Sequence, residues 1–246
     1  MIHTSATSTR RGVRALPNSA SGRVGKGTAV ILRVARLELE AALARLEEAL
    51  RGYGAPIVDA FRPGLDASYV SDVLRREGLG AHPDALTWFG WHDAAETARP
   101  VHADDGSVIR YGGETVLVGP WWMLTLAQSL DYRRMHLENI GGGIEPYEEP
   151  GDVSRAPEGW LPIATSEGAG ELCLDTTAAG SAPLYVLDPE SLREGPREQF
   201  ASLAELAAAM TRAVEHGHVV PHPHDSRAAM IDSSELPDDL RPLAYW

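Results

Sequence analysis

The sequence contains one cysteine, Cys173, and no apolar run that approaches the ~20 residues needed to cross a bilayer. A single cysteine excludes an intrachain disulfide and suits the reducing cytoplasm. The N-terminal residues also lack the apolar segment of a secretory signal. We therefore expect a cytoplasmic protein that makes no direct contact with a membrane.

Motifs that carry catalysis are also missing. No Gly-x-Ser-x-Gly elbow is present, and Cys173 lacks the sequence context of a nucleophile. Residues 25–28 copy only part of a phosphate-binding loop, and carboxylate pairs such as Asp104-Asp105 are common in an acidic chain. We expect a non-catalytic protein without a cofactor, and a hydrolase with unrecognised motifs is the open alternative.

Basic residues are scarce after the first 37 positions. Seven of the 22 Lys and Arg residues precede the first acidic residue, Glu38, which leaves 15 bases against all 35 acids. This balance argues against nucleic-acid binding by the globular part, because phosphate contact requires clustered Lys and Arg. It favours a cationic protein partner, although solubility alone would produce the same balance.

The chain divides into a tail, a domain and an extension. Residues 1–28 are rich in Ser, Thr, Gly and Arg, which predicts a disordered basic tail. We expect one domain over residues 29–220 and a C-terminal extension over 221–246. The leucines of the first helix predict a core-facing side, with a dimer seam as the alternative. Apolar spacing predicts helices over residues 30–51, 66–77, 83–91, 125–137 and 202–217. Capping residues mark three of these helix starts, namely Asp66, the Thr125–Gln128 box and the Ser202–Glu205 box.

The strongest strand pattern lies in residues 160–188. It predicts three strands in an antiparallel meander, because the connections are too short for a crossover. Pro162 indicates a sheet edge or a bulge, and the alternation in 171–175 predicts a half-buried strand with Cys173 and Asp175 on one face. Further strands are expected at 108–111 and 115–118, beside turns at 104–106 and 111–113. The predicted fold is α+β, a mostly antiparallel sheet of about five to six strands flanked by helices.

Two groups of motifs stand out along the chain. Residues 160–164 read WLPIA, 170–175 read GELCLD and 200–206 read FASLAEL. Upstream, residues 82–93 read HPDALTWFGWHD. Together these motifs resemble the SUKH superfamily, in its branch of fungal cell-wall-assembly regulators and bacterial immunity proteins. The resemblance covers residues 66–217. The chain departs from the family pattern at Ala94, where Gly is usual, and at His82, where Leu is usual.

The resemblance implies a protein-binding module. The commonest bacterial role in this superfamily is immunity within a polymorphic toxin system, in which the protein neutralises a toxin, often a nuclease with a basic face, by direct binding. An acidic surface would cover the phosphate-binding cleft of the toxin, and exposed aromatic side chains would anchor the contact. The fungal relatives imply an alternative, an intracellular regulatory scaffold.

Two segments are candidates for the binding surface. The predicted helix at 83–91 carries four large apolar side chains that cannot all face one way, although packing in the core would also explain them. The stretch 138–175 holds nine acids against only Arg155, although a loop such as 139–152 can be acidic merely to stay soluble. The expected partner-binding residues are Trp88, Trp91, Asp93, Glu145, Tyr147, Glu148, Glu149, Asp152, Glu167 and Asp175.

A histidine cluster near the C-terminus could suggest a metal. Pro221 and Pro223 make the segment extended, unlike the helix-borne histidine pairs of most zinc sites. We therefore expect no metal site, although the residue types would suit one. The cluster consists of His216, His218, His222 and His224, followed by Asp225.

Overall fold

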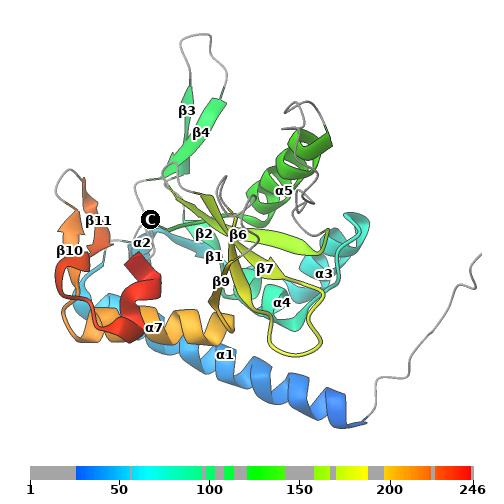
Figure 1. Cartoon of the computed structure of the whole chain (residues 1–246), viewed down its shortest axis with the longest axis horizontal. Coiled ribbons are helices and arrows are strands. Elements are labelled where there is room, and N and C mark those ends of the chain that lie inside the picture. The colour runs from blue at the N-terminus through cyan, green and yellow to red at the C-terminus, as the bar shows by residue number, and fades with distance from the viewer. Residues whose placement is uncertain are drawn as a thin grey trace, which may run out of the picture.

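The computed structural model is built around a five-stranded antiparallel sheet with helices packed beside it (Figure 1). The strand order is β5-β6-β7-β8-β9, so the α+β fold predicted from the sequence is confirmed. These strands are Trp122–Met123 (β5), Trp160–Ser166 (β6), Gly170–Asp175 (β7), Leu184–Leu187 (β8) and Arg197–Phe200 (β9). The structure describes residues 26–55, 57–95, 98–102, 108–113, 121–141, 158–166, 170–187, 197–222 and 225–244.

The predicted meander is confirmed as β6, β7 and β8. The register pairs Leu174 with Leu161 of β6 and with Leu184 of β8, and these three leucines are buried in the main core. The β6–β7 register shifts between Pro162 and Ala164, as expected for a bulge beside a proline. The expectation that β7 is half-buried was wrong, because the positions on both of its faces are buried from residue 171 to 174.

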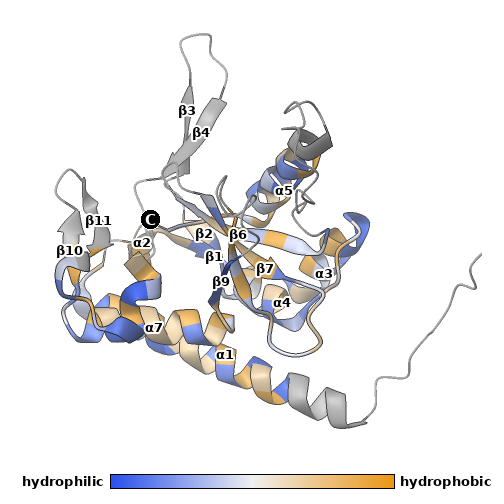
Figure 2. Ribbon diagram, viewed as in Figure 1, coloured by the Kyte–Doolittle hydropathy of each residue, from blue (hydrophilic) through white to orange (hydrophobic). Residues whose placement is uncertain are grey.

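The helices correspond closely to the predicted segments, and α1 and α7 pack along each other (Figure 1). Both helices carry apolar residues interleaved with polar ones (Figure 2), which is the pattern of helices with one buried side. The helices are Lys26–Tyr53 (α1), Ile57–Ala60 (α2), Ala67–Arg76 (α3), Pro83–Trp91 (α4), Leu126–Gly141 (α5) and Leu203–Glu215 (α7), followed by the short 3-10 helices Ser233–Glu235 (η1) and Asp238–Ala244 (η2).

The leucine stripe of α1 belongs to the core. Leu39, Leu43, Leu46 and Leu50 are all at most 1 % exposed, so the core interpretation holds over the dimer-seam alternative. Gly54, with φ +79°, ends the helix in the left-handed conformation that glycine adopts without strain. The predicted tail was too long at its C-terminal end, because residues 26–28 form the first turn of α1.

Local capping explains where the other helices begin. The carboxylate of Asp66 accepts hydrogen bonds from the backbone of Ser68 and Tyr69 at the start of α3. Ser202 accepts from the backbone of Glu205 at the start of α7. Both caps were predicted and are confirmed.

The predicted capping box of α5 is also present. Thr125 and Gln128 exchange backbone-to-side-chain hydrogen bonds of 2.9 and 3.1 Å. The helix continues to Gly141, so residues 139–141 are helical and not part of the predicted acidic loop.

Three two-stranded sheets surround the central one. The expected strand at 108–111 exists, but its described partner is the unpredicted β3, and residues 112 and 113 belong to the strand and not to a turn. The strand expected at 115–118 lies outside the described residues. The pairs are Phe61–Pro63 (β1) with His92–Ala95 (β2), Ala98–His102 (β3) with Val108–Gly113 (β4), and Val219–His222 (β10) with Asp225–Ile231 (β11).

The C-terminal residues are part of the same fold. The predicted boundary at residue 220 falls inside β10, which pairs with β11. Leu240 and Leu243 of η2 are buried in the main core, and η2 packs against α7. The described residues after position 220 are therefore not an extension but pack with the rest of the domain. None of the described helices is long and apolar enough to span a membrane.

Candidate partner-binding site

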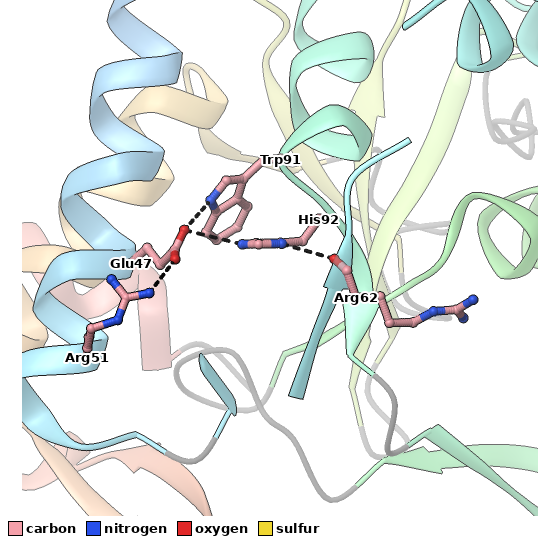
Figure 3. A network of polar contacts seen from close by, with 5 residues as sticks. All are labelled: Glu47, Arg51, Arg62, Trp91 and His92. Atoms are coloured by element: carbon pink, nitrogen blue, oxygen red, sulfur yellow. Dashed lines mark hydrogen bonds and ion pairs between the residues drawn. The ribbon is translucent and has the colours of Figure 1, made fainter. Parts of the chain in front are cut away.

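The aromatic motif at the end of α4 is tied to α1 by one carboxylate. Glu47 accepts a hydrogen bond from Arg51 at 2.7 Å and another from the indole N–H of Trp91 at 3.1 Å (Figure 3). Burial alone would raise the pKa of Glu47, but the bonds from Arg51, Trp91 and His92 and the charge of His92 outweigh it, so the pKa is lowered. Glu47 therefore holds the end of α4 against α1 as a carboxylate.

His92 lies between two acceptors. Its Nε2 is 3.3 Å from the Glu47 carboxylate, and its Nδ1 is 3.0 Å from the backbone carbonyl of Arg62 (Figure 3). Both oxygens are acceptors, so each ring nitrogen can donate to its neighbouring oxygen when that nitrogen carries a hydrogen. Phe61 stacks on the ring with centroids 4.1 Å apart. His92 thus joins α1, β1 and β2.

Asp93, an expected partner-binding residue, is used inside the fold. It is 9 % exposed, and its carboxylate accepts a hydrogen bond of 2.8 Å from the backbone N–H of Leu126 at the start of α5. The positive end of the helix dipole favours a negative charge at this place. The prediction that Asp93 faces a partner was wrong, because the buried carboxylate caps α5.

Trp88 is also a core residue. Its side chain is 2 % exposed, packs in the main cluster and lies 5.7 Å from Trp91 between ring centroids. The alternative that α4 aromatics pack in the core is therefore confirmed for Trp88, and its assignment to a binding surface was wrong. Trp91 is only partly buried against the core, so its contact with a partner stays a prediction.

A second aromatic cluster lies on the other face of the central sheet. The rings of Trp160 on β6 and Tyr185 on β8 stack with centroids 4.6 Å apart and planes 9° apart. They meet over Cys173 of the intervening β7, which pairs directly with Tyr185. A small residue at position 173 leaves room for this stack, and the thiol is completely buried beneath it.

Carboxylates surround this stack. Tyr185 pairs across the strands with Glu198 of β9, and Trp160 pairs with Asp175 of β7, so the four residues share one face. Burial raises the pKa of the Tyr185 hydroxyl, and the negative charges of Glu198 and Asp175 raise it further. We call Trp160, Asp175, Tyr185 and Glu198 the Tyr185 patch.

The exposed part of the Tyr185 patch is its acidic side. Glu198 is exposed, and Asp175 and Tyr185 are partly exposed, whereas Trp160 is buried beneath them. The Asp175 carboxylate accepts hydrogen bonds from the backbone and hydroxyl of Thr177 at 2.8 and 2.6 Å. These bonds hold the charge in place beside the ring. Asp175 is thus a sequence-predicted residue that lies in the patch, and its contact with a partner stays a prediction.

A polar contact continues the same face toward α5. Glu171, two residues before Cys173, lies 2.9 Å from Nε2 of His136 on α5, and the two side chains form an ion pair when the imidazole is protonated. Burial raises the pKa of the Cys173 thiol well above its ordinary value, and the charge of Glu171 adds to this effect. The thiol is therefore held in its neutral form.

The other predicted residues are only partly placed by the structure. The rings of His216 and His218 are 6.4 Å apart, and His224 lies outside the described residues. Within the described part of the chain, no three His, Cys, Asp or Glu side chains gather in a way that could hold a metal ion. The expected contacts outside the described residues are Glu145, Tyr147, Glu148, Glu149, Asp152 and Glu167.

Tyr185 and Glu198 did not emerge from the sequence as site residues. Tyr185 stands in a predicted strand, but nothing in the polar run of residues 197–199 predicts β9. Only the pairing of β8 with β9 brings the two side chains together. The sequence signal that pointed to this site was the alternation of residues 171–175 in β7, which places Asp175 on the face opposite the leucines.

A scan against protein-family models finds no family that matches this chain, and a search of curated proteins finds no match.

Proposed function

We propose that this chain is a non-catalytic binding module that neutralises a cationic toxin by covering its basic surface, in the manner of a bacterial immunity protein. The observation that carries the proposal is the Tyr185 patch, in which an aromatic ring lies between two carboxylates on one face of the central sheet. The proposed partner contact is a Lys or Arg side chain of the toxin.

The chemistry of the patch suits such a side chain. A cation over an aromatic face is attracted by the ring quadrupole, and nearby carboxylates supply hydrogen-bond acceptors for its N–H groups. The stack on Trp160 holds the Tyr185 ring in one orientation, so little side-chain entropy is lost when a partner binds. The acidic balance of the chain after residue 37 would also speed the approach of a basic protein.

The resemblance to the SUKH superfamily supports this proposal at one further position. Ala94 has φ +62°, a conformation that glycine adopts without strain and alanine rarely adopts. Glycine is the residue that the family usually has there. The positive φ of residue 94 is therefore the conformation that a glycine at this position would favour, which agrees with the resemblance.

The sole cysteine of the chain gives no support to a hydrolase. Cys173 is completely buried, and its raised thiol pKa disfavours the thiolate that a cysteine nucleophile requires. In a binding module, the Cys173 side chain needs only to fill space in the protein interior.

The experiment that tests the function is protection by co-expression. The protein encoded by the adjacent open reading frame is expressed in a bacterial host with and without this chain, and growth and complex formation are measured. We expect toxicity that the wild-type chain abolishes, together with a stable complex of the two purified proteins. Full toxicity in the presence of this chain and no complex would overturn the proposal, as would turnover of an ester, peptide, phosphate or glycoside substrate that a single substitution abolishes.

A further inference from the structure

Helix α1 has a second apolar stripe on the side opposite its buried leucines. Val34 and Leu37 are 48 % and 56 % exposed, and Ala41 and Ala44 are exposed as well. Their spacing of three, four and three residues places all four on one side of the helix. The core leucines from Leu39 to Leu50 point the other way, so this stripe has no role in the core of the chain.

The position of the stripe makes it accessible. The N-terminal part of α1 extends beyond the end of α7 (Figure 1), and the exposed Val34 and Leu37 lie toward that end. A helix that exposes large apolar side chains in this way gains stability when a partner covers them. The pattern of the stripe is the seam of a short coiled coil.

We propose that this stripe binds the same stripe of a second copy of the chain, with the two α1 helices antiparallel. In this arrangement Val34 of one copy lies opposite Leu37 of the other, and the reverse contact forms at the same time. Residue 41 then lies opposite position 30. The projecting parts of the two helices overlap, and the two sheets lie far from the contact.

Charge complementarity supports a second copy as the occupant. With Val34 opposite Leu37, the seam places Arg33 of each copy beside Glu40 of the other, which forms two symmetric ion pairs. Both side chains are exposed, and Glu40 already lies 2.8 Å from Arg36 within its own helix. A parallel arrangement would instead place Glu48, the next residue of the stripe, against Glu48 of the other copy. Like charges at this place would repel, which favours the antiparallel pair.

The contact is small. Stable dimers bury about 800 Å² on each partner, and a seam of about three helical turns buries less, so we expect association that depends on concentration in the micromolar range. This dimer would form without any toxin. The inference is therefore independent of the proposed function, and either can fail alone.

The first test is the mass of the full chain in solution, measured by sedimentation equilibrium over rising protein concentration. We expect the wild-type chain to pass from monomer to dimer, and Leu37→Glu to remain monomeric at every concentration. Tyr69→Glu is the matched control, because Tyr69 is 53 % exposed on α3, outside the stripe, and should dimerise as the wild type does. A wild-type chain that stays monomeric, or a Leu37→Glu chain that still dimerises, would overturn the proposal.

Two further variants test the arrangement. Arg33→Glu should weaken the dimer at least ~tenfold, and Arg33→Glu with Glu40→Arg should restore most of the loss, because the pairs are re-formed with opposite signs. To test the orientation, the Ala41→Cys variant should not cross-link to itself, because the two copies of residue 41 are about eleven residues out of register in the antiparallel pair. The native Cys173 is buried and does not interfere. Efficient self-linking of Ala41→Cys would contradict the antiparallel arrangement.

Discussion

The carboxylate of Asp93 accepts a hydrogen bond from the backbone N–H of Leu126, at 2.8 Å, and thereby fastens the turn after α4 to the first turn of α5. The two residues are 33 positions apart in the chain. The motif from Trp88 to Asp93 carries much of the family resemblance, and its side chains therefore serve mainly to stabilise the fold. Trp88 packs in the core, Trp91 and His92 bind Glu47, and Asp93 caps α5.

Replacing Asp93 by alanine should destabilise the protein. The change leaves the N–H of Leu126 without its acceptor and removes a charge that the helix dipole favours, which together cost about 1 to 3 kcal/mol. The free energy of unfolding in urea measures this loss. Asp72→Ala, at an exposed position of α3, is the matched control and should change stability by less than about 0.5 kcal/mol. Equal stabilities for the two variants would contradict the capping role.

Replacing Glu47 by glutamine should cost stability at neutral pH and less in acid. The folded pKa of Glu47 lies below its ordinary value of 4.5, so the carboxylate contributes its full stabilisation above that value and loses it as the pH falls through the folded pKa. We expect a loss of about 1 to 3 kcal/mol at pH 7, because hydrogen bonds from charged and neutral donors are weakened.

The pH dependence distinguishes this effect from simple packing. The free energies of unfolding of the wild type and of Glu47→Gln should converge as the pH falls below 4.5. Glu48→Gln changes an exposed neighbour, so its free energy of unfolding should match that of the wild type at every pH. If the free energies of unfolding of the wild type and Glu47→Gln differ by the same amount down to acid pH, the charge of Glu47 contributes nothing to stability.

Gly64 should tolerate no side chain. A Cβ at this position would lie 1.9 Å from the carbonyl oxygen of Gly90, so the connection between β1 and α3 could not approach the end of α4. We expect Gly64→Ala to lose at least ~3 kcal/mol of stability or to fail to fold. Gly180→Ala, where the new Cβ meets nothing within 4 Å, should melt within a few degrees of the wild type. Similar melting temperatures for the two variants would contradict the close approach.

The thiol of Cys173 should react only when the protein unfolds. It is buried under the Trp160–Tyr185 stack, and its raised pKa keeps it in the neutral, unreactive form. Labelling with a thiol reagent at pH 8 should therefore be slow in the native state and rapid in denaturant. Tyr185→Ala, which opens the stack, should speed native labelling. Rapid labelling of the wild-type chain would show that the outer face of the sheet is open at Cys173.

The elements that could be predicted from the sequence are those determined by neighbouring residues. Each predicted cap makes its hydrogen bonds with residues at most three positions away, so the helix start could be recognised from the local sequence. These caps are Asp66, Ser202 and the Thr125–Gln128 pair. The alternation of β7 was equally local. The strands β3 and β9 were missed because Pro100 and the polar residues 197–199 do not resemble strands, and both form through pairing with a neighbour.

The candidate site depended on contacts between distant residues, so the sequence predicted little of it. Asp93 and Trp88 looked like surface residues because their partners, Leu126 and the core, are not visible in the local pattern. Tyr185 and Glu198 become neighbours only through the pairing of β8 with β9. Asp175 is the one expected contact residue that the structure places in the Tyr185 patch.

The affinity of two charge-reversal variants for the toxin tests the role of the Tyr185 patch. Glu198→Lys changes an exposed residue inside the patch, and Glu235→Lys makes the same change of charge at an exposed position of η1 outside it. Calorimetric titration with the protein of the adjacent open reading frame should give Glu198→Lys a Kd at least ~tenfold weaker, a loss of about 1.4 kcal/mol, and should leave Glu235→Lys close to the wild type. If both variants bind as the wild type does, or if both weaken equally, the Tyr185 patch is not the surface that meets the partner.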